Sequence, residues 1–158
     1  MLRRPANLFA LIVAAGAPAA LLLGAYISQL GFGLYPCEMC WWQRYAHFAA
    51  LGFAMLAAIL SGHRWWLVAA ALAMGTSAAI GGYHAGVEYG WWQGITACAV
   101  PSASSAADAL EAVLNAPLVR CDVAPWSMMG ISLAGWNFLF SLAAALTVGF
   151  LLGRTKEG

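Results

Sequence analysis

The sequence predicts an all-α membrane protein, built as a bundle of four transmembrane helices. Three observations indicate this fold. The chain of 158 residues is 63% hydrophobic, and only 8% of its residues are charged, whereas a soluble domain carries about 25% charged residues. The apolar residues also gather in four long runs. The net charge of +1 argues against a nucleic-acid partner, which requires a basic patch.

Each apolar run is about 20 residues long, enough for a helix that crosses roughly 30 Å of hydrocarbon. Backbone groups in lipid must be hydrogen-bonded within their own segment, so these runs should be helices, and they lack the alternation of a lipid-facing barrel. We therefore expect a single integral membrane domain over residues 1–158, with lipid around it and two outer loops at 31–40 and 88–126. The four expected spans are residues 8–30, 41–60, 65–87 and 130–152.

The charges predict how the chain is oriented. Five of the seven basic residues fall on one side of the expected bundle, namely Arg3, Arg4, Arg64, Arg154 and Lys156. Because Lys and Arg stay on the cytoplasmic side, both termini should be cytoplasmic and both outer loops should face the opposite compartment. A cleaved signal peptide is the alternative reading of the first run, but its apolar character continues to Leu30, which is too long for a signal core.

All four cysteines lie in the two outer loops. Cys37 and Cys40 form a Cys-x-x-Cys pair in the first loop, while Cys98 and Cys121 lie in the second. The outer compartment is oxidising, so disulfides form and persist there. Four cysteines allow three pairings, and closeness along the chain favours Cys37–Cys40 and Cys98–Cys121.

The first pair has the features of a redox-active site. A cysteine pair at positions i and i+3 of a helix start can satisfy disulfide geometry. Cys40 lies near the positive end of the helix dipole, and Arg44 follows one turn later on the same face. Both features stabilise a thiolate, which is the reactive species, so we expect a lowered pKa at Cys40. An inert structural disulfide is the alternative, but it would constrain only a very short loop.

Two other uses of a Cys-x-x-Cys pair do not match the sequence. Haem attachment requires a histidine after the second cysteine, where Trp41 stands instead. A structural zinc site usually has two cysteine knuckles, and Cys98 and Cys121 are too far apart in the chain to form the second. We therefore expect no metal site.

The long second loop is predicted to carry a disulfide and a short helix. Closing Cys98 to Cys121 would constrain about 24 residues, worth about 3.4 kcal/mol as a structural staple. An exposed loop disulfide is also open to attack by an incoming thiolate, and two disulfides on one face favour a relay. Between Cys98 and Cys121, one helical face is formed by Ala106, Leu110, Val113 and Leu114. This pattern predicts a short amphipathic helix lying on the membrane surface, with a plain surface helix as the alternative.

Two further residues are candidates for ligand binding. Arg44 is either a functional cation or an anchor that extends to lipid headgroups, and we favour function because of its register with Cys40. His84, near the outer end of the third run, would donate a hydrogen bond to a ligand carbonyl or form a helix–helix contact. We expect Glu88, one turn further, to be solvated, with orientation of His84 as the alternative.

These motifs together resemble one known family. The pattern Cys37-Glu38-Met39-Cys40 followed by Arg44 is similar to the first outer loop of the disulfide bond formation protein B (DsbB) family. The four spans and the two-cysteine second loop are similar as well. So is the segment that begins at Pro125-Trp126 and continues through Gly130, Ile131, Ser132, Leu133, Ala134, Gly135, Trp136 and Asn137. The resemblance covers essentially the whole chain.

The resemblance implies an enzyme of the bacterial inner membrane that oxidises thiols at the expense of a membrane quinone, either ubiquinone or menaquinone. Its expected partner is a periplasmic thioredoxin-like dithiol protein of the DsbA type, and its cysteine loops would be periplasmic. Cys98 matches the family cysteine that forms the mixed disulfide with this partner. Cys121 would then pass electrons to Cys37 through an interloop disulfide, and Cys40 would donate them to quinone. Arg44 and His84 match family residues beside the quinone ring.

Two alternatives stay open at the level of sequence. A vitamin K epoxide reductase-like oxidoreductase also has four helices and four cysteines, although its Cys-x-x-Cys pair is expected after the long cysteine loop, whereas here it comes first. A non-enzymatic membrane assembly protein with stapled loops belongs to a different class. These two alternatives differ from each other in whether the protein consumes quinone.

Overall fold

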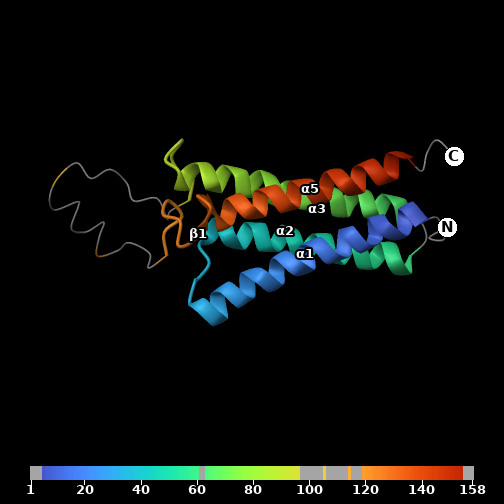
Figure 1. Ribbon diagram of the computed structural model, residues 1–158, viewed down its shortest axis with the longest axis horizontal. Helices are drawn as coiled ribbons and strands as arrows, with labels where there is room; N and C mark the ends of the chain where they lie inside the picture. The colour runs from blue at the N-terminus through green and yellow to red at the C-terminus, as the bar shows by residue number, and fades with distance from the viewer. Residues whose placement is uncertain (1–4, 61–62, 97–104, 106–113, 115–118, 155–158) are drawn as a thin grey trace.

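The computed structural model describes residues 5–60, 63–96, 105, 114 and 119–154. Within these ranges the chain forms a bundle of long helices and one small hairpin (Figure 1). The elements are α1 (Pro5–Phe32), α2 (Glu38–Ile59), α3 (His63–Glu88), β1 (Ser127–Met128), β2 (Ile131–Ser132) and α5 (Leu133–Arg154). The prediction of a predominantly helical chain is confirmed over these ranges. Cys98 and, except for Leu114, the amphipathic helix expected near 106–114 lie outside the described residues.

The helix at the end of the chain begins at Leu133, three residues later than expected, because a hairpin precedes it. β1 pairs with β2 in antiparallel fashion. Met129 and Gly130 between them both have positive φ, at 55° and 77°, as the two central residues of a type I′ turn require. Residues with these angles cannot belong to an α-helix. The Ser132 hydroxyl then accepts a hydrogen bond from the backbone N–H of Gly135 at 3.1 Å and so caps the first turn of α5.

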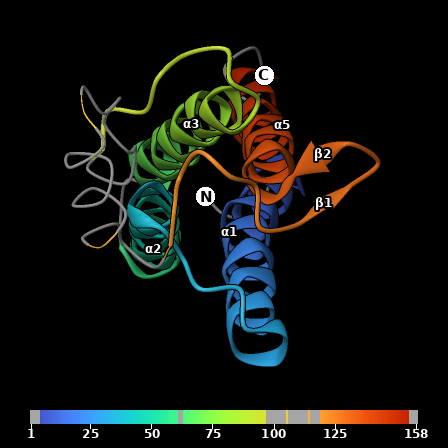
Figure 2. The ribbon, with the colours of Figure 1, turned by 90° about the vertical axis from the view of Figure 1, so that its left-hand side faces the viewer.

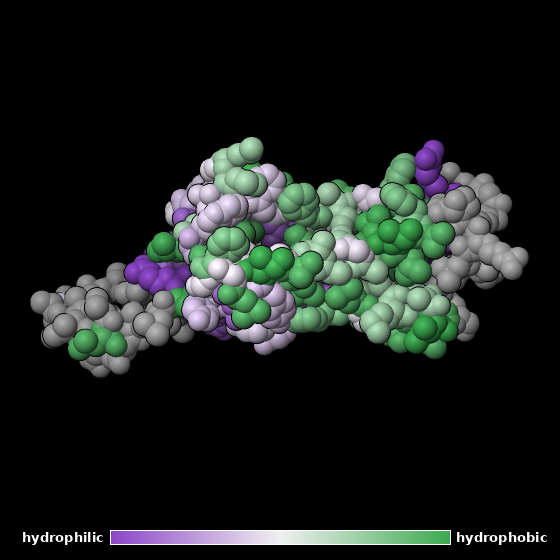
Figure 3. Space-filling view, turned by 60° about the horizontal axis from the view of Figure 1, so that its bottom comes forward, coloured by the Kyte–Doolittle hydropathy of each residue, from purple (hydrophilic) through white to green (hydrophobic). Residues whose placement is uncertain are grey.

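Three of the helices are long and apolar enough to cross a membrane: Asn7–Phe32, Arg64–Glu88 and Leu133–Arg154. The described surface agrees with a lipid environment, because large apolar side chains are exposed along the helices, including Leu23, Leu72 and Leu146 at 62–68%. Figure 3 shows hydrophobic side chains along the length of the bundle, with the strongest hydrophilic colour mostly near its ends.

Helix α2 falls outside this group because it carries several polar side chains. Gln43, Arg44 and His47 are all buried in the bundle, at 3–6% exposure. Its outward residues are apolar, as Met55 and Ile59 show at 65% and 75% exposure. The polar residues that lower the mean hydropathy of α2 therefore face the interior of the protein.

The beginning of α1 and the end of α5 lie at one end of the bundle, and the hairpin and the start of α2 lie at the other (Figures 1 and 2). Helix α1 diverges from the other helices toward its own C-terminal end. A core of small residues packs the half nearest the chain ends; it includes Ala10, Ala14, Ala50, Ala54, Ala57, Ala70 and Met74. A second, smaller core at the hairpin end contains Cys37, Met39, Val87 and Cys121.

Helices α3 and α5 approach each other closely at Gly81. A Cβ atom added there would lie 2.9 Å from Asn137 Nδ2 and 3.0 Å from the carbonyl oxygen of Ala134. Both distances are too short for a carbon atom, and one of the neighbours is backbone. A glycine at this position therefore allows the two helices to contact each other around Asn137.

We predict that Gly81→Ala lowers the free energy of unfolding by about 1–3 kcal/mol, because the added methyl group forces α3 and α5 apart. Gly75→Ala is the matched control on the same helix, since a Cβ atom there meets nothing within 4 Å. The control should be neutral or more stable by about 0.5–1 kcal/mol, as expected for glycine removal from a helix. Unfolding in mixed detergent micelles measures both variants; equal effects would contradict the close approach.

Candidate functional site

The Cys-x-x-Cys pair lies at the start of α2. Cys37 is the N-cap residue, and its sulfur accepts a hydrogen bond from the backbone N–H of Cys40 at 3.4 Å. Both cysteines are free thiols, and the Cys37 thiol donates a hydrogen bond to Cys40 Sγ over a distance of 3.1 Å. The helix start thus holds the two sulfur atoms close together, because capping fixes Cys37 against the first turn.

The second outer loop brings Cys121 to this pair. The sulfur atoms of Cys37 and Cys121 and a ring nitrogen of His84 all lie within 4.8 Å of one another, and all three residues are buried. Cys121 also accepts a hydrogen bond from the Thr96 hydroxyl at 3.5 Å. The fold therefore places Cys37 of the first loop beside Cys121 of the second, although the two are 84 residues apart in the chain.

The two thiols of the first pair have opposite pKa shifts. Hydrogen bonding with the sulfurs of Cys121 and Cys40, together with burial, raises the pKa of the Cys37 thiol. Cys40 stands one residue before the expected span that starts at Trp41. The hydrogen bond that it accepts from Cys37 lowers its pKa to about 5; burial opposes this shift, and His84 adds to it. The predicted lowering at Cys40 is confirmed, but its largest cause is Cys37.

We predict that alkylation of Cys40 in the reduced protein follows a pH midpoint near 5. The thiolate is the reactive form, so reactivity should rise as the pH passes upward through this value and be lost below it. Cys37→Ala removes the hydrogen-bond donor, and the midpoint should move upward toward the usual thiol value of about 8.5. Cys121→Ala leaves that donor in place and should keep the low midpoint. A wild-type midpoint near 8.5, read by mass spectrometry of iodoacetamide-treated protein, would refute this.

Arg44 is buried and is held mainly by helix α1. Its guanidinium donates hydrogen bonds to Gln29 Oε1 at 2.6 Å and to the carbonyl oxygen of Ala25 at 3.2 Å. It also lies over the rings of Tyr26 and Trp41, with its central carbon 4.8 and 5.1 Å from their centroids. These contacts fix the direction of the cation. The sequence suggested register with Cys40 but did not indicate the partners on α1.

His84 and Glu88 are both inside the protein, next to the cysteines. His84 Nε2 is 3.6 Å from Cys37 Sγ and 3.7 Å from a carboxylate oxygen of Glu88. The side chain of Glu88 is only 2% exposed. The expectation that Glu88 is solvated is therefore wrong. The two residues are one helical turn apart on α3, so the turn that directs His84 toward Cys37 also directs Glu88 inward.

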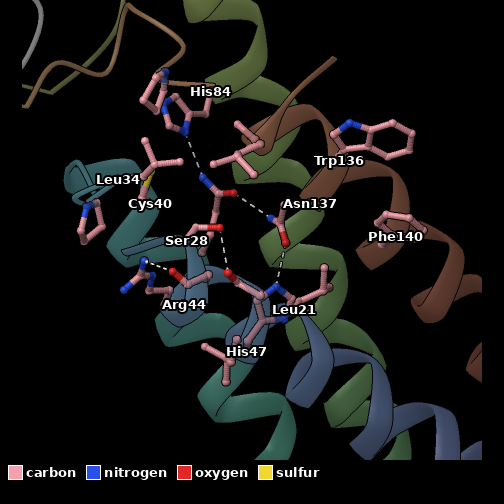
Figure 4. Close-up of a pocket in the computed structure, with 18 of the residues that line it drawn as sticks. Leu21, Ser28, Leu34, Cys40, Arg44, His47, His84, Trp136, Asn137 and Phe140 are labelled. Atoms are coloured by element: carbon pink, nitrogen blue, oxygen red, sulfur yellow. Dashed lines mark hydrogen bonds between the residues drawn. The ribbon is translucent and has the colours of Figure 1, made fainter. Parts of the chain in front are cut away.

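A buried network of hydrogen bonds extends from His84 into the bundle (Figure 4). The Gln43 amide group donates to His84 Nδ1 at 3.1 Å, and its oxygen accepts from Asn137 Nδ2 at 2.7 Å. His47 Nε2 in turn lies 2.8 Å from Asn137 Oδ1. Ser77 and Ser141 complete the network at its inner end. Side chains of α2, α3 and α5 are thereby joined in one polar chain.

Sequence reasoning did not identify this network, although a signal for it exists. Gln43 and His47 are four residues apart in a run of otherwise apolar residues, and so are Asn137 and Ser141. Polar residues repeated at helical spacing within a membrane span usually face the protein interior. The partner of each pair could not be read from the spacing, because it depends on how the helices pack.

Two cavities meet at Cys40. The first, of about 260 Å³, lies between α1, α2 and α5, and Figure 4 shows Cys40, Arg44, His47, His84 and Asn137 around it. The second, of about 350 Å³, lies on the loop side and includes Cys37, Val119 and Arg120 in its lining. Cys40, His84 and Glu88 line both cavities. The Cys40 sulfur thus lies between the loop side and the interior of the bundle.

Comparison with known proteins identifies the family. The family model for disulfide bond formation protein DsbB matches residues 7–151. The chain belongs to the DsbB family. Proteins named disulfide bond formation protein B include relatives from Acidovorax sp. (strain JS42), 31% identical over 98% of this chain and 91% of theirs, and from Azoarcus sp. (strain BH72), 32% identical over 98% of both. A relative of the same name from Verminephrobacter eiseniae is 32% identical over 99% of this chain and 90% of its own. No solved structure matches the chain.

Membership of the DsbB family makes this chain a membrane protein of disulfide bond formation, with thiol–disulfide oxidoreductase activity. The site has the groups that such exchange requires. A thiolate attacks a disulfide sulfur and releases a second thiolate. In this DsbB-family chain the Cys121, Cys37 and Cys40 sulfurs lie close enough for successive exchanges within one buried site.

Proposed function

We propose that this DsbB-family protein is an inner-membrane thiol:quinone oxidoreductase that reoxidises a periplasmic thioredoxin-like dithiol protein of the DsbA type. One observation carries the proposal: Cys40 lines both the loop-side cavity and the cavity inside the bundle, with Cys37 3.1 Å away. Electrons that enter at the loops can therefore leave toward a lipid-soluble acceptor through a single sulfur atom.

The proposal includes four membrane spans, with both chain ends cytoplasmic and the cysteines periplasmic. Three helices are long and apolar enough to cross a membrane. Helix α2 has a similar length, with apolar side chains on its outside and polar side chains facing the interior of the bundle. Arg64 donates a hydrogen bond to the carbonyl oxygen of Leu152 at the end of the bundle that holds the chain ends. Arginines at this end support a cytoplasmic position.

The relay begins with the second loop pair. A thiolate of the partner attacks Cys98 of a Cys98–Cys121 disulfide, which forms a mixed disulfide and releases Cys121 as a thiolate. Cys121 then attacks Cys37 of a Cys37–Cys40 disulfide, which forms the interloop bond and releases Cys40. The second thiol of the partner attacks its own mixed-disulfide sulfur, which releases Cys98, and Cys98 attacks Cys121. The partner and the second pair are then disulfides, and Cys37 and Cys40 hold the two electrons.

The pKa values of the first pair support attack at Cys37. A leaving thiol of low pKa departs faster in disulfide exchange. Because the pKa of Cys40 is about 5, Cys40 is the better leaving group of the pair, so an incoming thiolate should bond to Cys37. Cys121 is the cysteine that lies beside Cys37. Geometry and leaving-group chemistry therefore favour the same interloop bond.

The cavity of about 260 Å³ has features that fit a quinone head group, of ubiquinone or menaquinone. Small-ligand pockets are mostly apolar, with a few directed polar groups, and here Leu21, Leu22 and Phe140 line the cavity beside Arg44. His47 Nδ1 and Trp136 Nε1 have no hydrogen-bond partner among the residues that the structure describes, and both residues line this cavity. A quinone bound here supplies an acceptor for two electrons and two protons. Arg44 places positive charge beside it, which stabilises developing negative charge.

The test is to mix the purified protein with a reduced thioredoxin-like partner and either quinone, and to follow the quinone absorbance. One quinone should be consumed for each disulfide formed in the partner. If the protein consumes neither quinone, the proposal is refuted and the assembly-protein alternative is favoured.

We predict that Arg44→Gln raises the KM for quinone by about 10- to 100-fold, because a charge-assisted hydrogen bond contributes about 1.5–3 kcal/mol. Arg64→Gln is the matched control: it removes an arginine at the far end of the bundle, where Arg64 binds the Leu152 carbonyl. The control should keep the wild-type KM. Equal KM values for both variants in the quinone assay would show that Arg44 has only a structural role.

A further inference from the structure

The described residues contain one buried cluster of soft ligand atoms. Cys37 and Cys121 each offer a sulfur, His84 offers a ring nitrogen, and the three atoms lie within 4.8 Å of one another. Cys37, Cys121 and His84 are 5%, 1% and 2% exposed. The spacing of the cysteines along the chain did not predict this cluster, because its members come from the first loop, the second loop and α3.

The distance between Cys37 and His84 fits a tetrahedral metal ion. Zinc binds sulfur at about 2.3 Å and imidazole nitrogen at about 2.0–2.1 Å, so a tetrahedral site has S···N edges of about 3.6 Å and S···S edges of about 3.8 Å. The distance from Cys37 Sγ to His84 Nε2 is 3.6 Å. A site with two thiolates and an imidazole favours Zn²⁺ over hard cations, which bind oxygen ligands.

Glu88 lies next to this cluster. One of its carboxylate oxygens is 3.7 Å from His84 Nε2, whereas the ligand atoms that lie within 4.8 Å of one another are those of Cys37, Cys121 and His84. A metal ion held by these three atoms would offset the charge of the two thiolates and leave its fourth position to water.

The surroundings of His84 allow it to be a ligand through Nε2. Metal-bound histidines usually donate their other ring N–H to an acceptor. Gln43 contacts His84 Nδ1 at 3.1 Å through its NH₂ group, and its oxygen accepts from Asn137 Nδ2. Metal binding through Nε2 therefore requires the Gln43 and Asn137 amides to turn together, so that the Gln43 oxygen accepts from the Nδ1–H of His84.

We propose that the reduced protein binds one Zn²⁺-class ion through Cys37, Cys121 and His84, with water in the fourth position. Binding transfers no electrons; two metal–sulfur bonds form, and the thiol protons of Cys37 and Cys121 are released to solvent. The site is gated by redox state, because a disulfide at Cys37 or Cys121 removes a thiolate ligand. While the ion is bound, the Cys37 sulfur is committed to the metal and is withheld from disulfide exchange.

Cobalt titration of the full-length protein in detergent tests this site and requires neither quinone nor partner, so its failure is distinct from failure of the proposed oxidase activity. In protein reduced with a phosphine under argon, one equivalent of Co²⁺ should produce the visible and thiolate charge-transfer bands of a tetrahedral site, and one equivalent of Zn²⁺ should abolish them. Protein with its disulfides formed should give no bands. Octahedral Co²⁺ spectra with reduced wild-type protein, or bands of equal strength with oxidised protein, would overturn the proposal without any variant.

Variants then assign the ligands. Cys121→Ser and His84→Ala should each weaken Co²⁺ binding by more than about 100-fold, the upper end of what changes outside the ligand set cost. Thr147→Val is the control, since the exposed Thr147 hydroxyl donates only to the Ala143 carbonyl within α5, and it should bind as wild type does. Unchanged binding by Cys121→Ser would refute the site.

Discussion

Cys40→Ser should reduce the rate of quinone reduction by at least about a thousandfold, the scale of loss that follows removal of a catalytic nucleophile. Serine cannot form a disulfide with Cys37, and its hydroxyl is not ionised at neutral pH, so electrons no longer leave through the bundle cavity that Cys40 lines. The variant should still oxidise one equivalent of partner dithiol through the second loop pair and then stop. Quinone absorbance and alkylation of the partner thiols measure the two halves separately.

Cys98→Ser is the complementary variant, and it should give the opposite pattern. It should fail to oxidise the partner, but its Cys37–Cys40 pair should still consume quinone when a small dithiol reduces it. Comparing the two variants separates loss of electron entry at Cys98 from loss of electron exit at Cys40. If both variants oxidise the partner with quinone over many turnovers, the relay is wrong.

Asn137→Leu should lower the free energy of unfolding by about 2–4 kcal/mol. Asn137 bonds to Gln43 Oε1 at 2.7 Å and to His47 Nε2 at 2.8 Å, and it accepts from the Ser141 hydroxyl at 3.1 Å. Leucine has a similar size but leaves these buried groups without that partner. Each unpaired buried group costs about 1–3 kcal/mol, although single interhelical bonds in membranes average nearer 0.6 kcal/mol. The cost summed over the three partners that lose Asn137 gives the expected range of about 2–4 kcal/mol.

Thr147→Val is the control for the loss of a polar group on the same helix. The Thr147 hydroxyl is exposed and donates only to the carbonyl oxygen of Ala143 within α5, so its loss should change the free energy of unfolding by no more than about 0.5 kcal/mol. Unfolding in mixed micelles compares the two variants. If Asn137→Leu falls within the range of the control, the network does not stabilise the bundle.

The identities of the reactive residues were predictable from the sequence because they depend on local patterns. A Cys-x-x-Cys pair at a helix start, and long apolar runs in a chain with 8% charge, are statements about neighbours in the chain. They were sufficient to predict a helical membrane protein with redox-active cysteines and a lowered pKa at Cys40. The start of α5 was missed because a positive φ at the non-glycine residue Met129 follows from the hairpin and has no sequence signal of its own.

The sequence by itself determined the solvent of this protein and the chemistry of its cysteines, since side-chain polarity and thiol reactivity belong to single residues and short segments. Only the tertiary structure decided which side chains meet. It placed Cys121 beside Cys37, buried Glu88 beside His84, directed Arg44 to Gln29, and joined Gln43 to Asn137. Apart from Glu88 and His84, which are one turn apart on α3, these contacts join residues on different helices and loops. They depend on how close the helices pack, and a small residue such as Gly81 sets that distance in ways that spacing along one helix does not reveal.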